Sequence, residues 1–249
     1  GNRVPEFLRT HPLSESRIAD TRNRAREYPK QIRQTSLNYQ LMRARVVVQL
    51  ADTPEEAVQH FHGELDGTPR SREASRYGLV LALTAAGRPA EASLELDDIW
   101  SGSPERIEYI VADAELDMAR NRASQAAAKL AKQLELYPQN HPLTMTYANA
   151  LMKNQQPHIA EEVLVAQSKV RPNDPGLWYL LAEVQGLSGN IIGLHQSRAE
   201  YFILNGILDE AERQLNYALK LVRNDYLTAA RINQRLADIA GMREQMERL

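Results

Sequence analysis

Residues 141–174 read HPLTMTYANALMKNQQPHIAEEVLVAQSKVRPND, and this stretch decides the fold. Tyr147 and Leu151 fall on one helical face in its first half, and Ala160 and Leu164 repeat the same spacing in its second half. The stretch therefore predicts two short amphipathic helices joined by a tight turn. Because a unit of this size cannot bury its own apolar face, it also predicts neighbours of the same kind.

A small residue four positions before a large apolar one recurs along the chain. The pairs are Ala57/Phe61, Ala90/Leu94, Ala126/Leu130, Ala160/Leu164 and Ala211/Leu215, so the alanines are 33, 36, 34 and 51 residues apart. Prolines end the second helix of the successive units at Pro69, Pro104, Pro138 and Pro172. The step of 51 is one unit and a half, which predicts that one helix between Trp178 and Ala211 serves two neighbours.

This pattern resembles the tetratricopeptide repeat (TPR), in which small residues lie where paired helices cross. We therefore predict an all-α fold, a TPR-like α-solenoid of antiparallel helix pairs. Residues 36–249 would hold about five to six pairs. A long polar helix from Tyr226 to Leu249 would cap the array.

Composition limits the functions that this chain can have. Its 249 residues are 43% apolar and 25% charged, which is typical of a protein with a continuous core. The net charge of −2 argues against nucleic-acid binding, and no apolar run is long enough to predict a transmembrane segment. The chain has no cysteine, so disulfides and thiolate metal sites are excluded.

Residues 1–35 do not follow the repeat pattern. With eight basic and four acidic residues they carry a charge of +4, which leaves −6 on the remainder. The run FLRTHPLSESRIA, residues 7–19, resembles the closing segment of HExxH zinc metalloprotease domains. Followed by a TPR array, it is similar to the periplasmic zinc metalloproteases that act in outer-membrane β-barrel assembly. The resemblance implies that residues 1–35 are the tail of a protease domain, a loop and a helix.

The family likeness carries further implications for activity and partners. The parent protein would be a periplasmic zinc endopeptidase, and this chain would bind its own protease domain, outer-membrane protein clients and the β-barrel assembly machinery. No HExxH occurs here, so we expect no catalytic residue and no cofactor in this fragment. Gly1 in place of methionine also favours an excised piece. His11 would lie beside the protease cleft, as a regulatory zinc ligand of the full-length protein.

Two surfaces are candidates for binding. Projecting the repeat onto the first helices predicts a peptide-binding groove lined by Glu115, Asn149, Tyr179, Glu183 and Glu200. The alternative is that these are solvated polar residues. Asp113 and Asp117 predict an acidic patch, or else a local ion pair with Arg120 or Arg122, because a carboxylate near a core needs a partner.

A free-standing TPR adaptor without an attached enzyme is the alternative function. The two functions differ in what precedes Asn2 in the gene. An HExxH domain with a signal peptide would indicate the protease, and a nearby start codon would indicate the adaptor.

Overall fold

The computed structural model describes residues 18–19, 21–24, 36–102 and 105–247. The chain divides into two compact units, Gly1–Tyr39 and Gln40–Leu249. The helices are α2 Leu37–Leu50, α3 Pro54–Asp66, α4 Arg72–Ala85, α5 Pro89–Trp100, α6 Ile107–Ala119, α7 Ala123–Leu136, α8 His141–Lys153, α9 Pro157–Val170, α10 Pro175–Ser188, α11 Ile191–Leu204, α12 Leu208–Leu221 and α13 Tyr226–Glu247.

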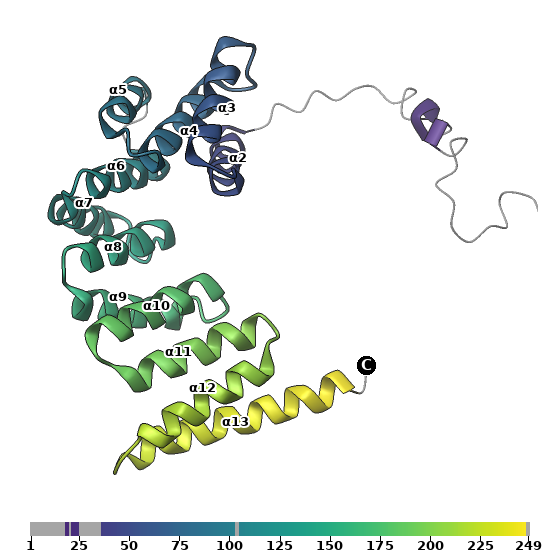
Figure 1. The fold of residues 1–249 in the computed structure, drawn as a ribbon, viewed down its shortest axis with the longest axis vertical. Helices are drawn as coiled ribbons and strands as arrows, with labels where there is room; N and C mark the ends of the chain where they lie inside the picture. The colour runs from purple at the N-terminus through teal and green to yellow at the C-terminus, as the bar shows by residue number, and fades with distance from the viewer. Residues whose placement is uncertain (1–17, 20, 25–35, 103–104, 248–249) are drawn as a thin grey trace, which may run out of the picture. The chain divides into compact units, whose positions relative to one another are not determined.

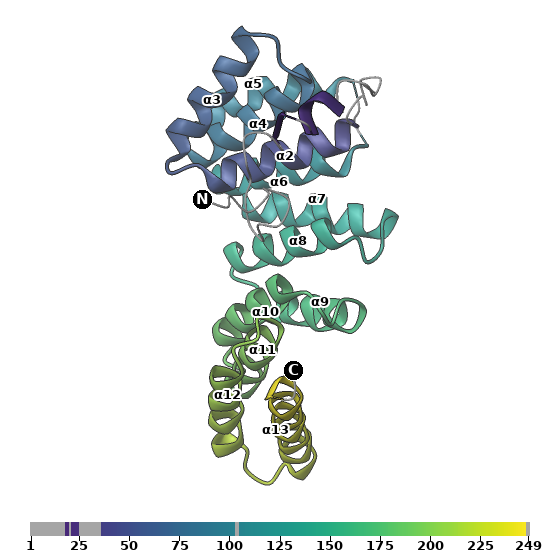
Figure 2. The same ribbon diagram turned by 90° about the vertical axis from the view of Figure 1, so that its right-hand side faces the viewer.

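Within the second unit, each helix from α3 to α13 packs against the next one along the chain (Figure 1, Figure 2). First helices of neighbouring pairs also meet, since α4 contacts α6 and α6 contacts α8. The described residues contain helices and turns and no strand. The predicted all-α array of antiparallel helix pairs is therefore confirmed.

The helices begin where side chains can satisfy their free N–H groups. Asp174 Oδ1 accepts a hydrogen bond from Leu177 N at 3.2 Å, and Ser71 Oγ accepts one from Ala74 N at 3.2 Å. Pro54, Pro89 and Pro157 stand at the first position of α3, α5 and α9, where the missing N–H costs nothing. These local signals place the helix starts and so fix which residues face the core.

One buried alanine marks each crossing, and it is always the fourth residue of its helix. Ala57, Ala126, Ala160 and Ala211 are at most 1% exposed, as predicted. The prediction of Ala90 and Leu94 was wrong, because Leu94 is 70% exposed and Ala90 also faces solvent. In α5 the crossing alanine and the large residue after it are Ala92 and Leu96, both buried. Because α5 starts at Pro89, its fourth residue is Ala92, and the corrected steps are 35 and 34.

The turns keep a stricter period than the alanines. A residue with positive φ occurs in the turns after α4, α6, α8, α10 and α11, namely Gly87, Asn121, Gln155, Gly189 and Gly206. The first four are 34 residues apart, and the last follows after 17. Helix α11 thus ends one unit and begins another half a period early. It packs against both α10 and α12, as the 51-residue step predicted.

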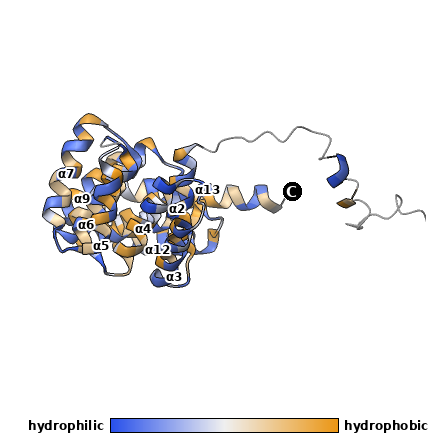
Figure 3. Ribbon diagram, turned by 90° about the horizontal axis from the view of Figure 1, so that it is seen from above, coloured by the Kyte–Doolittle hydropathy of each residue, from blue (hydrophilic) through white to orange (hydrophobic). Residues whose placement is uncertain are grey.

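The helices bury one face each and leave the other polar. Figure 3 shows hydrophobic and hydrophilic residues mixed along the ribbon. One core cluster runs from α6 to α10 around Leu130, Leu143 and Leu164, and a second joins α11, α12 and α13 around Leu215 and Ile239. Among the described residues, no helix is long and apolar enough to cross a membrane.

Candidate functional site

Helices α10 and α11 form an aromatic pocket of about 320 Å³, which we call the tyrosine pocket. It is lined by Tyr179, Ala182, Glu183, Arg198, Tyr201, Phe202 and Gln214. Tyr179 and Glu183 are one helical turn apart on α10, on the face opposite the buried Leu177, Leu181 and Val184. The core side of α10 therefore holds the two pocket residues in place on its open side.

The rings of this pocket contact one another edge to face. The Tyr179 and Tyr201 centroids are 5.5 Å apart with the rings inclined by 61°, and the Tyr201 and Phe202 centroids are 5.4 Å apart. Tyr179 is nevertheless 54% exposed. Among the described residues, neither Glu183 nor Arg198 has a hydrogen bond or ion pair. The tyrosine pocket thus offers aromatic faces together with one unpaired acid and one unpaired base.

Two other residues of the predicted groove are engaged within the protein. Glu115 accepts hydrogen bonds from Arg45 Nη1 and Nη2 at 2.8 and 3.1 Å. Glu200 accepts hydrogen bonds from Arg235 Nε and Nη2 at 2.7 and 2.5 Å, which joins α11 to α13. Burial opposes the charge on Arg45, but Glu115 and Tyr77 outweigh it and raise the pKa of Arg45. These glutamates therefore bridge helices.

The structure brings together only part of the predicted groove. Tyr179 and Glu183 line one pocket, whereas Asn149 is a half-buried residue of α8 that lines none of the pockets described here. Glu115 and Glu200 lie in separate ion pairs on α6 and α11. The sequence analysis missed Tyr201 and Phe202, although their place in the helix with two neighbours was a signal for an exposed aromatic cluster.

Asp113 and Asp117 share a lysine. Lys129 Nζ of α7 donates to Asp113 Oδ2 and to Asp117 Oδ2, both at 2.6 Å. Burial opposes the lysine charge, but the two hydrogen bonds outweigh it and raise the pKa of Lys129. The partner is thus Lys129 rather than the predicted Arg120 or Arg122. Arg120 instead donates to the Pro89 carbonyl at 2.7 Å.

The acidic residues border a second cavity. It measures about 440 Å³ between α5, α6 and α7 and is lined by Leu96, Asp97, Trp100, Ile110, Asp113, Lys129, Lys132 and Gln133. Its two acids face two lysines, so the Asp113 region is charge-balanced. An acidic patch open to a basic partner does not form there.

Zinc ligation falls outside this array. No group of three or more histidine, aspartate or glutamate side chains that could hold a metal occurs among the described residues. His11, the predicted regulatory ligand, lies outside the described residues.

Comparison with known proteins gives two kinds of match. A family model described as "Tetratricopeptide repeat" matches residues 117–184. The chain is 29% identical over 247 residues to the "Beta-barrel assembly-enhancing protease" of Escherichia coli (strain K12), covering 99% of this chain and 50% of that protein. It is 29% identical to the "Putative beta-barrel assembly-enhancing protease" of Vibrio cholerae serotype O1, covering 98% of this chain and 51% of that protein. The predicted resemblance is confirmed, and the chain spans about half the length of these curated relatives.

A solved structure is also similar. It is a thermophilic TPR protein of Thermus thermophilus, 18% identical, with a TM-score of 0.49, covering 81% of this chain and 100% of that one.

Proposed function

We propose that this chain, a TPR protein similar over 99% of its length to β-barrel assembly-enhancing proteases, is the polypeptide-binding part of such a protease. It would bind unfolded or stalled outer-membrane proteins and the β-barrel assembly machinery in the periplasm, and present clients to an attached zinc protease domain. The name of the relatives supports the process. The open tyrosine pocket supports polypeptide binding, and it is the observation that carries the proposal.

The pocket suits an extended segment with an apolar or aromatic side chain. Such a side chain would pack on Tyr179 and Tyr201, where aromatic contacts stabilise beyond their buried area. The unpaired Glu183 and Arg198 would hydrogen-bond to the segment's backbone or polar side chains. Zinc chemistry would belong to the attached domain, because the described residues offer no ligand set.

Calorimetry with an extended peptide from an outer-membrane β-barrel protein tests the proposal. Tyr179→Ala should weaken binding by about tenfold or more, as truncation of a central aromatic contact does. Tyr226→Ala is the matched control, because Tyr226 is 86% exposed and lies outside the pocket. Unchanged binding by Tyr179→Ala would contradict the role of the pocket. Asn149→Ala tests the wider groove in the same way.

The same proposal gives His11 a role in the intact protein. Its neutral imidazole would occupy the zinc position that otherwise holds the attacking water, until a bound client pulls the loop away. The resemblance of residues 7–19 supports this role. His11→Ala in the full-length protein should then raise proteolysis of a model substrate above the resting level with zinc content unchanged, and unaltered activity would contradict it.

A further inference from the structure

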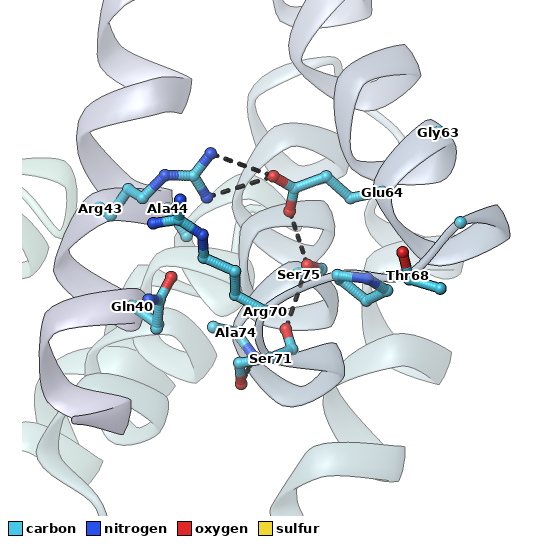
Figure 4. Close-up of a pocket in the computed structure, with 12 residues that line it drawn as sticks. Gln40, Arg43, Ala44, Gly63, Glu64, Thr68, Arg70, Ser71, Ala74 and Ser75 are labelled. Carbon is cyan, nitrogen blue, oxygen red and sulfur yellow. Dashed lines mark hydrogen bonds and ion pairs between the residues drawn. The ribbon is translucent and has the colours of Figure 1, made fainter. Parts of the chain in front are cut away.

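A second pocket lies at the other end of the array, far from α10 in the chain. It encloses about 320 Å³ between the first residues of the second unit, the end of α3 and the start of α4 (Figure 4). Its lining residues, which we call the arginine pocket, are Gln40, Arg43, Ala44, Gly63, Glu64, Gly67, Thr68, Pro69, Arg70, Ser71, Ala74 and Ser75. It is the only one of the described pockets with two arginines and one acid in its wall.

The acid of this pocket is fully engaged. Glu64 Oε1 accepts hydrogen bonds from Arg43 Nη1 and Nη2 at 3.2 and 3.1 Å and lies 3.3 Å from His60 Nε2. Glu64 Oε2 accepts a hydrogen bond from Ser75 Oγ at 2.6 Å. Burial opposes ionisation, but Ser75, Arg43 and His60 together lower the pKa of Glu64. Glu64 therefore stays ionised and holds Arg43 against the wall.

Arg70 supplies a second positive charge with no acid of its own. It stands in the connection between α3 and α4, and Figure 4 shows its side chain running across the opening toward α2. Among the described residues, no hydrogen bond or ion pair engages its guanidinium. Two guanidinium groups thus face one saturated carboxylate, and the pocket keeps an excess of one positive charge.

From this arrangement we propose that the arginine pocket binds one carboxylate, the free α-carboxylate at the end of a polypeptide. A guanidinium matches the planar carboxylate in a two-point contact, and the charge of −1 equals the excess in the pocket. A phosphate monoester would bring nearly twice that charge. The cavity is also larger than a bare anion, so the last side chain fits against Pro69, Ala44 and Ala74.

The polypeptide nature of the ligand rests on the proposed function, whereas the carboxylate preference rests on this pocket alone. Thr68 adds a hydroxyl beside Arg70 at the opening. The tyrosine pocket would then hold an internal segment and the arginine pocket a chain end.

Fluorescence anisotropy with a labelled hexapeptide ending in leucine tests the inference. The peptide with a free terminus should bind at least tenfold more tightly than its C-terminal amide, because a charge-assisted contact is lost. Arg70→Gln should weaken binding of the free acid about tenfold and leave the amide unaffected. Arg223→Gln, an exposed arginine outside the pocket, is the matched control and should change neither.

Arg43 needs a conservative variant, because removing its charge leaves Glu64 without its partner. Arg43→Lys retains the charge and loses the planar fork, so it should fold and bind the free acid more weakly. Equal binding of acid and amide by the native chain, or unaltered binding by Arg70→Gln, would overturn the inference.

Further arms separate the sources of the anion. An amidated peptide with an internal glutamate that binds as tightly as the free acid would overturn the assignment to the chain terminus. Inorganic phosphate that displaces the peptide where equal ionic strength of acetate does not would show a phosphate site and overturn the carboxylate. Binding that is lost with Tyr179→Ala but equal for acid and amide would overturn this inference and leave the proposed function standing. Absence of binding by every peptide would count against both.

Discussion

Arg45 of α2 and Glu115 of α6 form a two-point ion pair across 70 residues of chain, with Nη1 to Oε1 at 2.8 Å. Arg45 Nη2 also donates to Tyr77 Oη at 2.8 Å, so three successive first helices are joined by one side chain. Tyr77 is fully buried, and burial raises its pKa to about 12. This contact ties the first three helix pairs together on the side where their first helices meet.

Arg45→Met should lower the free energy of unfolding by about 1–3 kcal/mol, because the Tyr77 hydroxyl and Glu115 lose their partner. Urea denaturation followed by circular dichroism measures it. Arg76→Met is the matched control: its partner Asp98 is exposed, so the loss should stay below about 1 kcal/mol. Equal losses in the two variants would contradict a special role for Arg45.

Gly78 lies against the ring of Phe61, and a Cβ there would overlap that ring. Gly78→Ala should therefore destabilise the protein by about 1–3 kcal/mol, although alanine is the better helix former. Gly241→Ala in α13 meets open space and should be neutral or stabilising by up to about 1 kcal/mol. Combining Gly78→Ala with Phe61→Leu should cost less than the sum of the two changes, as expected of residues in contact.

Lys129→Met should destabilise the protein by about 1–3 kcal/mol, because Asp117 is only 4% exposed and loses its ion-pair partner. Adding Asp117→Asn should recover part of this loss by removing the buried charge. Asp113→Asn alone should have a smaller effect, since Asp113 is more exposed. Thermal denaturation of the four variants checks the order, and a loss from Asp113→Asn as large as that from Lys129→Met would contradict it.

Acidification should weaken the junction between α8 and α10. Burial lowers the pKa of His141, with Arg171 acting in the same direction and Asp174 opposing it. The unfolded chain therefore binds more protons than the folded one below about pH 6.5, and the free energy of unfolding falls as pH drops through that window. The melting temperature should fall less between pH 7.5 and 5.5 in His141→Gln than in the native chain. His158→Gln, at an exposed histidine, should behave as the native chain does.

The sequence predicted the repeat well because each unit carries its own signals. Pro157 starts α9 and Ala160 is buried, both readable from one stretch of 34 residues. In α5 two alanines stand two apart, each with a leucine four positions on, and only packing against α4 and α6 shows that Ala92 faces the core. Spacing alone could not separate Ala92 from Ala90.

The sites were harder to predict because they depend on neighbours in space. Whether Glu115 is open or paired depends on Arg45, which reaches it only once α2, α4 and α6 are stacked. The arginine pocket likewise needs Arg70 from a connection and Arg43 from a helix. Tyr179 and Glu183 could be placed together because they lie one turn apart on one helix.

The 17-residue step from Gly189 to Gly206 determines where the array can be shortened or lengthened. Removing 34 residues between equivalent turns, such as Asn121 and Gln155, would join surfaces that already match, so the earlier units should be exchangeable modules. After Gly189 no such cut exists, since α11 presents one side to α10 and the other to α12. These three helices can be inherited, transplanted or lost only together, and the tyrosine pocket goes with them.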